Sequence, residues 1–166
     1  IRRIAAIIII HKYRGEFAEY LLPYNYAVGI NGGIDFITMT LRLGVERYIT
    51  NAEKESKYKL PSRALVSLDI KNMFNAISRE KLIEIVSNEF PHLEGFADLL
   101  YERFGQTCVK MEDGTWLHIP VEEGFSQGCP VSPLFSALVL KVILDKINKK
   151  LCRAAELRLR YGDALD

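Results

Sequence analysis

The chain has 166 residues, of which 49% are hydrophobic and 26% are charged, and its formal net charge at pH 7 is +1. This length allows one substantial core or two subdomains that share one, and the composition excludes a disordered or fibrous protein. The near-neutral charge excludes the strongly basic character of many nucleic-acid-binding domains, although a local basic channel is compatible with it.

The three cysteines, Cys108, Cys129 and Cys152, are odd in number and lack the spacing of a zinc site. They predict a reducing, intracellular setting in the nucleus or cytoplasm, without a disulfide framework. The apolar run over residues 5–10 is too short to span a bilayer, so we expect no membrane partner. Because the chain begins with isoleucine, we expect it to be a piece of a longer protein.

The first 62 residues are predicted to be helical. Residues 2–13 are apolar with basic edges, which indicates a helix packed in the core. A short helix over 16–21 should end before Pro23, since proline disfavours helix in the residue ahead of it. A loop over 24–33 follows, and apolar residues then recur at helical spacing from 35 to about 51. The charged stretch 51–62 is expected to be a solvated connection.

The remaining residues mix strands with helices. Residues 64–69 form a short apolar run, typical of a buried strand. Ser78 is a suitable N-cap for a helix over 79–88, and another helix is expected from about 93 to 104. Residues 106–120 read as a hairpin, in which Asp113 and Gly114 supply the positive φ angles of a tight turn.

A long helix from 133 to about 153 should follow, and the alternating residues 157–161 could start another strand. Strands interleaved with helices, two of them forming a hairpin, predict an α+β fold with an antiparallel sheet. A fragmentary α/β fold is the alternative.

Asp69 is the first candidate for chemistry, because it lies where the predicted strand leaves the core. Mg²⁺ takes oxygen ligands in octahedral geometry, usually from one or two carboxylates together with substrate phosphates. The Asp69 carboxylate and the Ile70 carbonyl could supply two of these oxygens. Alternatively, Asp69 only caps the following turn through its own backbone.

The turn after Asp69 leads to Phe74, which taken alone is a core aromatic. Free backbone N–H groups at Asn72 and Met73 in this turn could form an anion-binding concavity for a triphosphate.

Gln127-Gly128 is the second candidate site. Glycine permits close approach of the backbone to a ligand, and glutamine can donate to and accept from a base or sugar edge. The alternative is an ordinary loop that starts a helix, with Ser132 and Pro133 as the start signals.

Together these segments resemble motifs A and B of the reverse transcriptases of non-LTR retrotransposons and group II introns. Motif A corresponds to residues 64–75, and motif B to residues 123–135, which contain Gln-Gly-Cys-Pro-x-Ser-Pro. The Gly-rich loop over 29–33 looks like a fingers motif of the same family. The resemblance implies a right-hand polymerase fragment, with a partial fingers subdomain over 1–62 and a partial palm over 63–166, whose antiparallel sheet packs on helices.

The resemblance also implies an activity, RNA-directed DNA polymerisation by two-metal nucleotidyl transfer with Mg²⁺ or Mn²⁺. Asp69 would be catalytic and would bind metal together with Ile70, and Phe74 would exclude a ribose 2′-hydroxyl. Gln127 and Gly128 would contact the incoming nucleotide and the template. The partners would be an RNA template, a DNA primer, dNTPs and the remainder of a parent polyprotein.

One motif departs from the family pattern. The expected Tyr-x-Asp-Asp of motif C has only Tyr161-Gly162-Asp163-Ala164 as a counterpart, so we expect the true motif beyond residue 166 and no polymerase activity from this fragment alone. Asp163 and Asp166 are then expected in an exposed turn. Lys141 and Lys149 could line a nucleic-acid track, with a solvated helix face as the alternative.

Two other functional classes stay open. The first is a degenerate, non-catalytic copy of the same fold, which binds nucleic acid or has no activity. The second is an unrelated Mg²⁺-dependent phosphohydrolase that uses Asp69, which would need further carboxylates at other strand ends.

Overall fold

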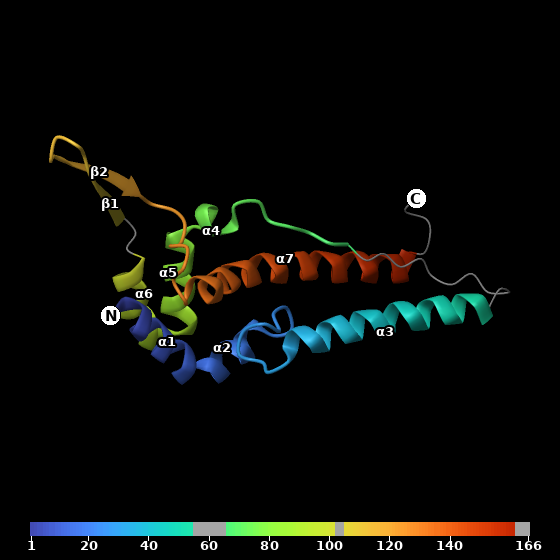
Figure 1. Cartoon of the computed structure of the whole chain (residues 1–166). Helices are drawn as coiled ribbons and strands as arrows, with labels where there is room; N and C mark the ends of the chain where they lie inside the picture. Colours follow the sequence, from blue (N-terminus) through green and yellow to red (C-terminus); the bar gives the residue numbers. More distant parts are fainter. Residues whose placement is uncertain (55–65, 102–104, 162–166) are drawn as a thin grey trace. The chain divides into compact units, whose positions relative to one another are not determined.

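The computed structural model describes residues 1–54, 66–101 and 105–161 (Figure 1). They belong to two units, one made of Ile1–Tyr13 with the residues from Asn72 onward, the other of Arg14–Lys71. Helices dominate, and the described residues contain one two-stranded antiparallel sheet. This combination of helices with an antiparallel sheet confirms the coarse α+β prediction.

The first unit contains a series of helices and the sheet. Its elements are α1 (Arg2–Lys12), α4 (Met73–Ala76), α5 (Arg79–Glu89), the 3₁₀ helix η1 (Pro91–Leu93), α6 (Glu94–Leu100), β1 (Gly105–Lys110), β2 (Trp116–Val121) and α7 (Ser132–Tyr161). The predicted N-cap is confirmed, because the Ser78 hydroxyl accepts a hydrogen bond from the Lys81 amide at 3.1 Å. Helix α6 ends at Leu100, earlier than predicted, and residues 102–104 lie outside the described part.

Helix α7 continues to Tyr161, so the prediction of a strand over 157–161 is wrong. These residues are mostly leucine and arginine, which are good helix formers, and the preceding turns already supply the helical hydrogen bonds. Alternation of polarity over five residues is a weaker signal than continuation of an existing helix. Asp163 and Asp166 lie outside the described residues.

The core of the first unit lies where α5, η1, α6 and the start of α7 meet. Helix α5 packs against η1, α6 and α7, and α4 contacts α7. Three aromatic rings stand at the centre, with centroids 4.6 Å apart for Tyr101 and Phe125, 6.0 Å for Tyr101 and Phe135, and 6.3 Å for Phe125 and Phe135. Such offset and edge-on contacts add to the stabilisation from burial itself.

Helix α1 has its predicted extent, but it is not packed in the core as expected. Among its residues only Ala6 is buried, while Ile4 and Ile8 are 63% and 57% exposed. The apolar character of this segment correctly predicted a helix. It could not show which face has a neighbour, because the isoleucines lie on several sides of the helix.

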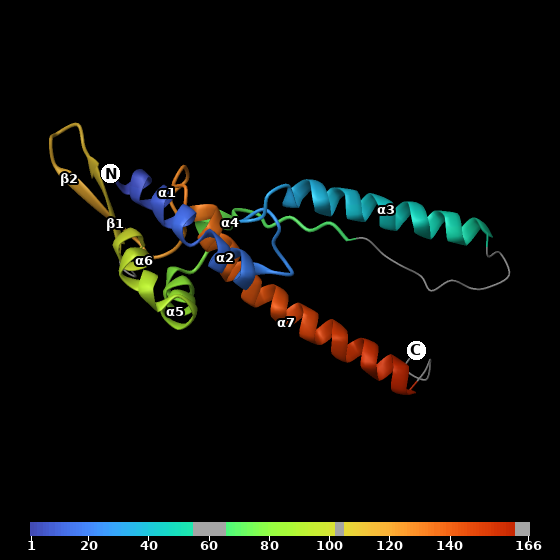
Figure 2. The same cartoon turned by 90° about the horizontal axis from the view of Figure 1, so that it is seen from below.

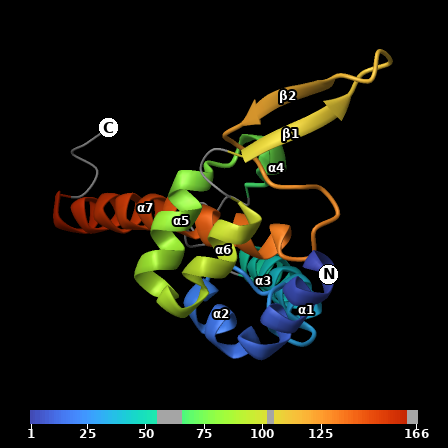
Figure 3. The same ribbon diagram turned by 90° about the vertical axis from the view of Figure 1, so that its left-hand side faces the viewer.

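Strands β1 and β2 form the predicted hairpin, which projects from the helices of its unit (Figures 1 and 3). Its turn differs from the prediction, because Gly114 has a positive φ (84°) and Asp113 does not. The Gly114 amide donates to the Met111 carbonyl, and the Met111 amide donates to the Thr115 carbonyl. Residues 106–120 are exposed, so this sheet does not pack on helices as a palm sheet was expected to do.

The second unit contains α2 (Arg14–Leu21) and α3 (Gly33–Lys54), joined by the predicted loop (Figure 2). Both helices start close to the predicted positions. Arg14 holds the Gly-rich loop through hydrogen bonds from its guanidinium to the Gly29 carbonyl (2.9 Å) and to the Asn31 side chain. The Gly-rich segment 29–33 therefore forms a loop that side-chain hydrogen bonds from Arg14 hold in place. Of the predicted connection 51–62, residues 51–54 belong to α3, and the others lie outside the described part.

The predicted strand at 64–69 is not formed over its described residues. Residues 66–70 have no regular secondary structure, and Val66 and Leu68 are 71% and 83% exposed. A strand requires a partner for its backbone hydrogen bonds, and β1 and β2 pair only with each other. The buried-strand prediction is therefore wrong for this part of the structure.

Candidate functional site

The end of the motif A-like stretch and the start of the motif B-like stretch are joined through their backbones. The Phe125 amide donates to the Phe74 carbonyl at 2.6 Å, and the Gly124 amide donates to the Ile77 carbonyl at 2.8 Å. An isolated antiparallel bridge pairs Ser78 with Glu123. Residues 74–78 and 123–125 therefore run alongside one another, although they are distant in the sequence.

Gly124 makes this close approach possible. It has a φ of +79°, and a Cβ atom at this position would lie 2.7 Å from the Asn75 carbonyl oxygen and 2.9 Å from the Asn75 Cα. Both neighbours belong to the backbone, so they cannot move away as the end of a flexible side chain could. Residue 124 must lack a side chain for the two stretches to meet in this way.

The corner made by residues 126–132 is held by a hydroxyl relay. The Ser132 hydroxyl donates its single proton to the Ser126 carbonyl at 2.9 Å, so the Tyr101 hydroxyl is the donor in its 2.7 Å hydrogen bond to Ser132. Backbone bonds from Cys129 to Ser126 and from Ser132 to Cys129 close the same loop. The sequence identifies Ser132 only as a helix start, because its position in the relay depends on Tyr101, which is distant along the chain.

Burial raises the pKa of Tyr101, and its neighbour Cys129 acts in the same direction, while the hydrogen bond with Ser132 opposes the shift. The ring is 2% exposed. An ionised phenolate here would lose hydration and could no longer donate to Ser132. The neutral form is therefore the one that holds the corner in place.

Phe74, Gln127 and Gly128 line one cavity of about 470 Å³. Its other lining residues are Arg3, Cys129, Pro130, Ser132 and Pro133. All of these residues belong to the first unit, and both Phe74 (37% exposed) and Gln127 are accessible to solvent. Two segments that were singled out separately thus contribute to the same cavity.

Arg3 is a basic lining residue that the sequence analysis did not single out for this site. Its position next to an apolar helix indicated only a charged helix edge. The side chain brings a positive charge to a cavity that is otherwise formed by apolar and neutral polar groups. This charge suits an anionic ligand.

A buried arginine, Arg79, holds the hairpin to the corner. The Arg79 side chain donates to the carbonyls of Gly124 and Val121, both at 2.8 Å, and its guanidinium lies 5.6 Å from the centre of the Tyr101 ring. Burial lowers the pKa of Arg79. The sequence identifies Arg79 only as the first position of a helix, because its hydrogen-bond partners lie more than 40 residues away.

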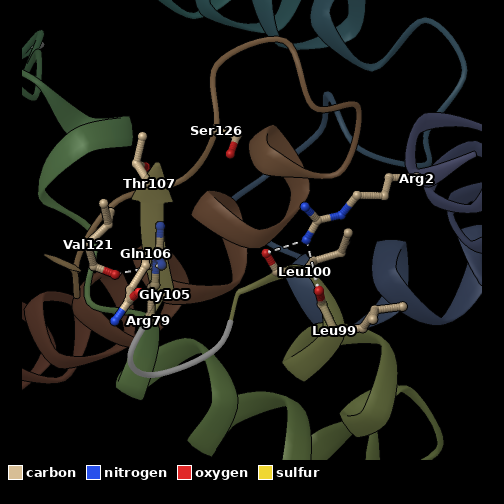
Figure 4. Close-up of a pocket in the computed structure, with 9 residues that line it drawn as sticks. All are labelled: Arg2, Arg79, Leu99, Leu100, Gly105, Gln106, Thr107, Val121 and Ser126. Atoms are coloured by element: carbon tan, nitrogen blue, oxygen red, sulfur yellow. Dashed lines mark hydrogen bonds between the residues drawn. The ribbon is translucent and has the colours of Figure 1, made fainter. Parts of the chain in front are cut away.

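Arg79 also lines a smaller cavity of about 310 Å³ with Arg2, which reaches it from α1 (Figure 4). The Arg2 guanidinium donates to the carbonyls of Leu99 (2.8 Å) and Leu100 (3.2 Å). Both arginines donate hydrogen bonds to backbone carbonyls at the ends of neighbouring elements. These structural contacts explain why two arginines line the cavity, without a ligand.

The remaining motif A-like residues fall in two places. Asn72 adopts a left-handed conformation (φ 54°) as the N-cap of α4, and the N–H groups of Met73 and Phe74 lie in its first turn, where a helix offers no acceptor. Asp69 and Ile70 are exposed and belong to the second unit. The structure therefore brings Phe74, Gln127 and Gly128 together within the first unit.

The two lysines predicted for a nucleic-acid track differ in their surroundings. Lys141 forms an ion pair with Asp145 at 2.7 Å, and its side chain is only 15% exposed. Lys149 is exposed on the later part of α7. Of the pair, Lys149 offers the more accessible charge to a phosphate backbone.

A search of the described residues finds no group of three or more histidine, cysteine, aspartate or glutamate side chains arranged to hold a metal ion. No helix in the part of the chain that the structure covers is long and apolar enough to cross a membrane. No protein-family model matches the chain, and comparisons with curated proteins and with solved structures likewise find no match.

Proposed function

We propose that the chain is part of an RNA-directed DNA polymerase of the reverse transcriptase type, and that the cavity at Phe74, Gln127 and Gly128 takes the incoming dNTP. One observation carries this proposal. The aromatic residue after Asp69 and the Gln-Gly corner, distant in sequence, line the same cavity and are held by backbone hydrogen bonds.

The lining suits a nucleotide. Phe74 and two prolines supply apolar surface against which a sugar or base can pack, and Gln127 can donate to or accept from a polar edge. The Arg3 guanidinium would bind the phosphates through charge-assisted hydrogen bonds. Phe74 would occupy the space that a ribose 2′-hydroxyl needs.

Asp69 and Ile70 would hold the divalent ion. An exposed carboxylate next to a carbonyl oxygen fits a Mg²⁺ or Mn²⁺ ion that takes its other ligands from phosphates and water. When bound, the ion would neutralise charge on the triphosphate during nucleotidyl transfer. The task of the protein is then to position the nucleotide, with Gln127 and Gly128 at its base or sugar and Arg3 at its phosphates.

A titration of the 166-residue chain with a fluorescent dNTP in Mg²⁺ tests the proposal. Gln127→Ala and Arg3→Ala should each weaken binding about tenfold, the expected loss for one hydrogen bond to a charged or desolvated partner. Lys150→Ala, on the exposed face of α7, is the matched control and should leave binding unchanged. Absence of saturable binding, or equal affinity in all three variants, would contradict the assignment.

Selectivity and metal dependence separate the enzyme from the non-catalytic alternative. Phe74→Ala should let the corresponding ribonucleotide bind about as well as the dNTP. Asp69→Asn should remove the Mg²⁺ dependence of binding in a polymerase fragment. If the affinity for a nucleotide or nucleic acid is the same with and without Mg²⁺, and is unchanged by Asp69→Asn, the result would instead support the degenerate, non-catalytic copy.

A further inference from the structure

The hairpin carries a cysteine and a histidine in direct contact, at a position that the proposed nucleotide site does not use. Cys108 on β1 is the register partner of His118 on β2, and the Cys108 Sγ lies 3.3 Å from the His118 Nδ1. Both side chains are exposed. The pairing follows from the antiparallel register, which places the side chains of opposed residues next to one another.

Gln106 completes the arrangement. Its Oε1 also lies 3.3 Å from the His118 Nδ1. With the imidazole neutral and its proton on Nε2, Nδ1 can accept the thiol proton of Cys108. Once it holds that proton, Nδ1–H can donate to the thiolate or to the Gln106 oxygen, so both states of the pair have a hydrogen-bond partner.

Lys110 is the charged residue of β1. It lies two residues after Cys108 on β1, and alternate residues of a strand share one side of the sheet. Lys110 therefore lies on the same side of the hairpin as Cys108 and His118. Glu112 lies beyond the strand, in the hairpin loop.

We propose that Cys108 is a reactive thiol that undergoes exchange with low-molecular-weight disulfides, with His118 as its general base. His118 Nδ1 takes the thiol proton, and the Cys108 Sγ attacks one sulfur of the disulfide. A new S–S bond forms as the original S–S bond breaks, and the departing thiolate takes the proton from His118. The disulfide supplies the oxidising equivalents, and one thiol leaves for each mixed disulfide formed.

Cys152 provides an internal comparison. It is exposed on α7, and its recorded contact is a long S···O approach of 3.8 Å to Asn148 on the preceding helical turn. Cys152 is therefore an exposed thiol like Cys108, but it contacts an amide oxygen and not an imidazole. Because both thiols are exposed, a difference between their rates of disulfide exchange would reflect the neighbouring side chains and not solvent accessibility.

The test uses oxidised glutathione on the fully reduced 166-residue chain, with each cysteine followed by peptide mapping and mass spectrometry. At pH 7, Cys108 should react about tenfold faster than Cys152, a modest general-base contribution for an exposed pair.

His118→Asn should reduce the Cys108 rate to that of Cys152 and leave the Cys152 rate unchanged. His11→Asn, which changes an exposed histidine on α1, is the matched control and should have no effect. Because a substitution in β2 could disturb the hairpin, Gln106→Leu gives a second test, and it should slow Cys108 while both reacting side chains stay in place. Equal rates at Cys108 and Cys152 in the unsubstituted chain, or a Cys108 rate insensitive to His118→Asn, would overturn the proposal.

Discussion

The two segments that contribute to the proposed nucleotide site differ in how the rest of the protein supports them. Residues 124–135 are held by backbone hydrogen bonds, by the Tyr101–Ser132–Ser126 relay and by the burial of Phe125 and Phe135. Residues 66–70 are exposed and have no regular structure. The first segment depends on neighbours within its own unit, whereas a strand at the second would need a further strand for pairing.

This difference has a functional meaning under the proposed activity. The corner at Gln127-Gly128 is preorganised, so a nucleotide would find its protein contacts largely formed. The carboxylate at Asp69 stands in an exposed segment, and ordering of that segment would cost conformational free energy when metal and nucleotide bind. Substitutions in the two segments should therefore differ strongly in their effects on folding.

The largest contrast is expected in the core. Phe135→Ala should lower the free energy of unfolding by about 3–5 kcal/mol, because it removes a fully buried ring and leaves a cavity. Leu68→Ala, at an 83% exposed position, should change it by less than about 0.5 kcal/mol. Urea unfolding followed by circular dichroism measures both, and a large effect at Leu68 would show that the 66–70 segment is packed in solution.

The second contrast concerns the join between the two stretches. Gly124→Ala should cost about 2–4 kcal/mol, because it combines a left-handed φ with a backbone clash against Asn75. Gly128→Ala shares the positive φ but has open space around it, so about 1–2 kcal/mol is expected from the same denaturation experiment. Equal costs for the two variants would mean that residues 74–78 do not lie against Gly124.

The third contrast tests the hydroxyl relay. Ser132→Ala should destabilise the chain by about 1–3 kcal/mol, since the Tyr101 hydroxyl and the Ser126 carbonyl both lose a partner. Ser136→Ala removes a buried hydroxyl without a hydrogen-bond partner among the described residues, so it should be neutral or stabilising by about 0.5 kcal/mol. If both substitutions cost the same, the relay contributes nothing to the stability of the corner.

The smallest effect is a pH dependence. Because burial raises the folded-state pKa of Tyr101, its stabilising contribution is complete below the ordinary tyrosine pKa near 10 and is lost as the pH rises above it. Tyr101→Phe should make the fall in the free energy of unfolding between pH 10 and 12 shallower, by at most about 1.4 kcal/mol per pH unit. Tyr13→Phe is the control, and identical slopes for all three proteins would exclude the shift.

Local signals in the sequence were sufficient for most of the helices. The Ser78 cap, Pro23 after α2 and the helical spacing of apolar residues in α3 act within a few residues, so they operate before any tertiary contact forms. The same holds for the identity of the candidate site, since Phe74, Gln127 and Gly128 were selected from short motifs. Their assignment to one cavity required the structure, because it depends on backbone bonds between residues 74–78 and 123–125.

The pairing register of the hairpin could not be predicted from the local sequence. A two-residue turn with Asp113 and Gly114 both at positive φ would place Cys108 opposite Ile119. In the structure only Gly114 has a positive φ, the loop is longer, and Cys108 faces His118. Because side chains alternate along a strand, a shift of one residue in the pairing decides whether these two groups meet.

The sequence by itself determined most of the helices, the Ser78 cap, the existence of the hairpin and the residues worth testing, because these features depend on neighbours close along the chain. The tertiary structure decided which residues share a surface: the clamp from Arg79, the relay through Ser132, the arginine at the cavity and the Cys108–His118 pair. It also decided against a strand at residues 66–70 and a buried α1. Strand pairing and burial depend on what lies alongside, and a linear pattern of apolar residues carries no information about that neighbour.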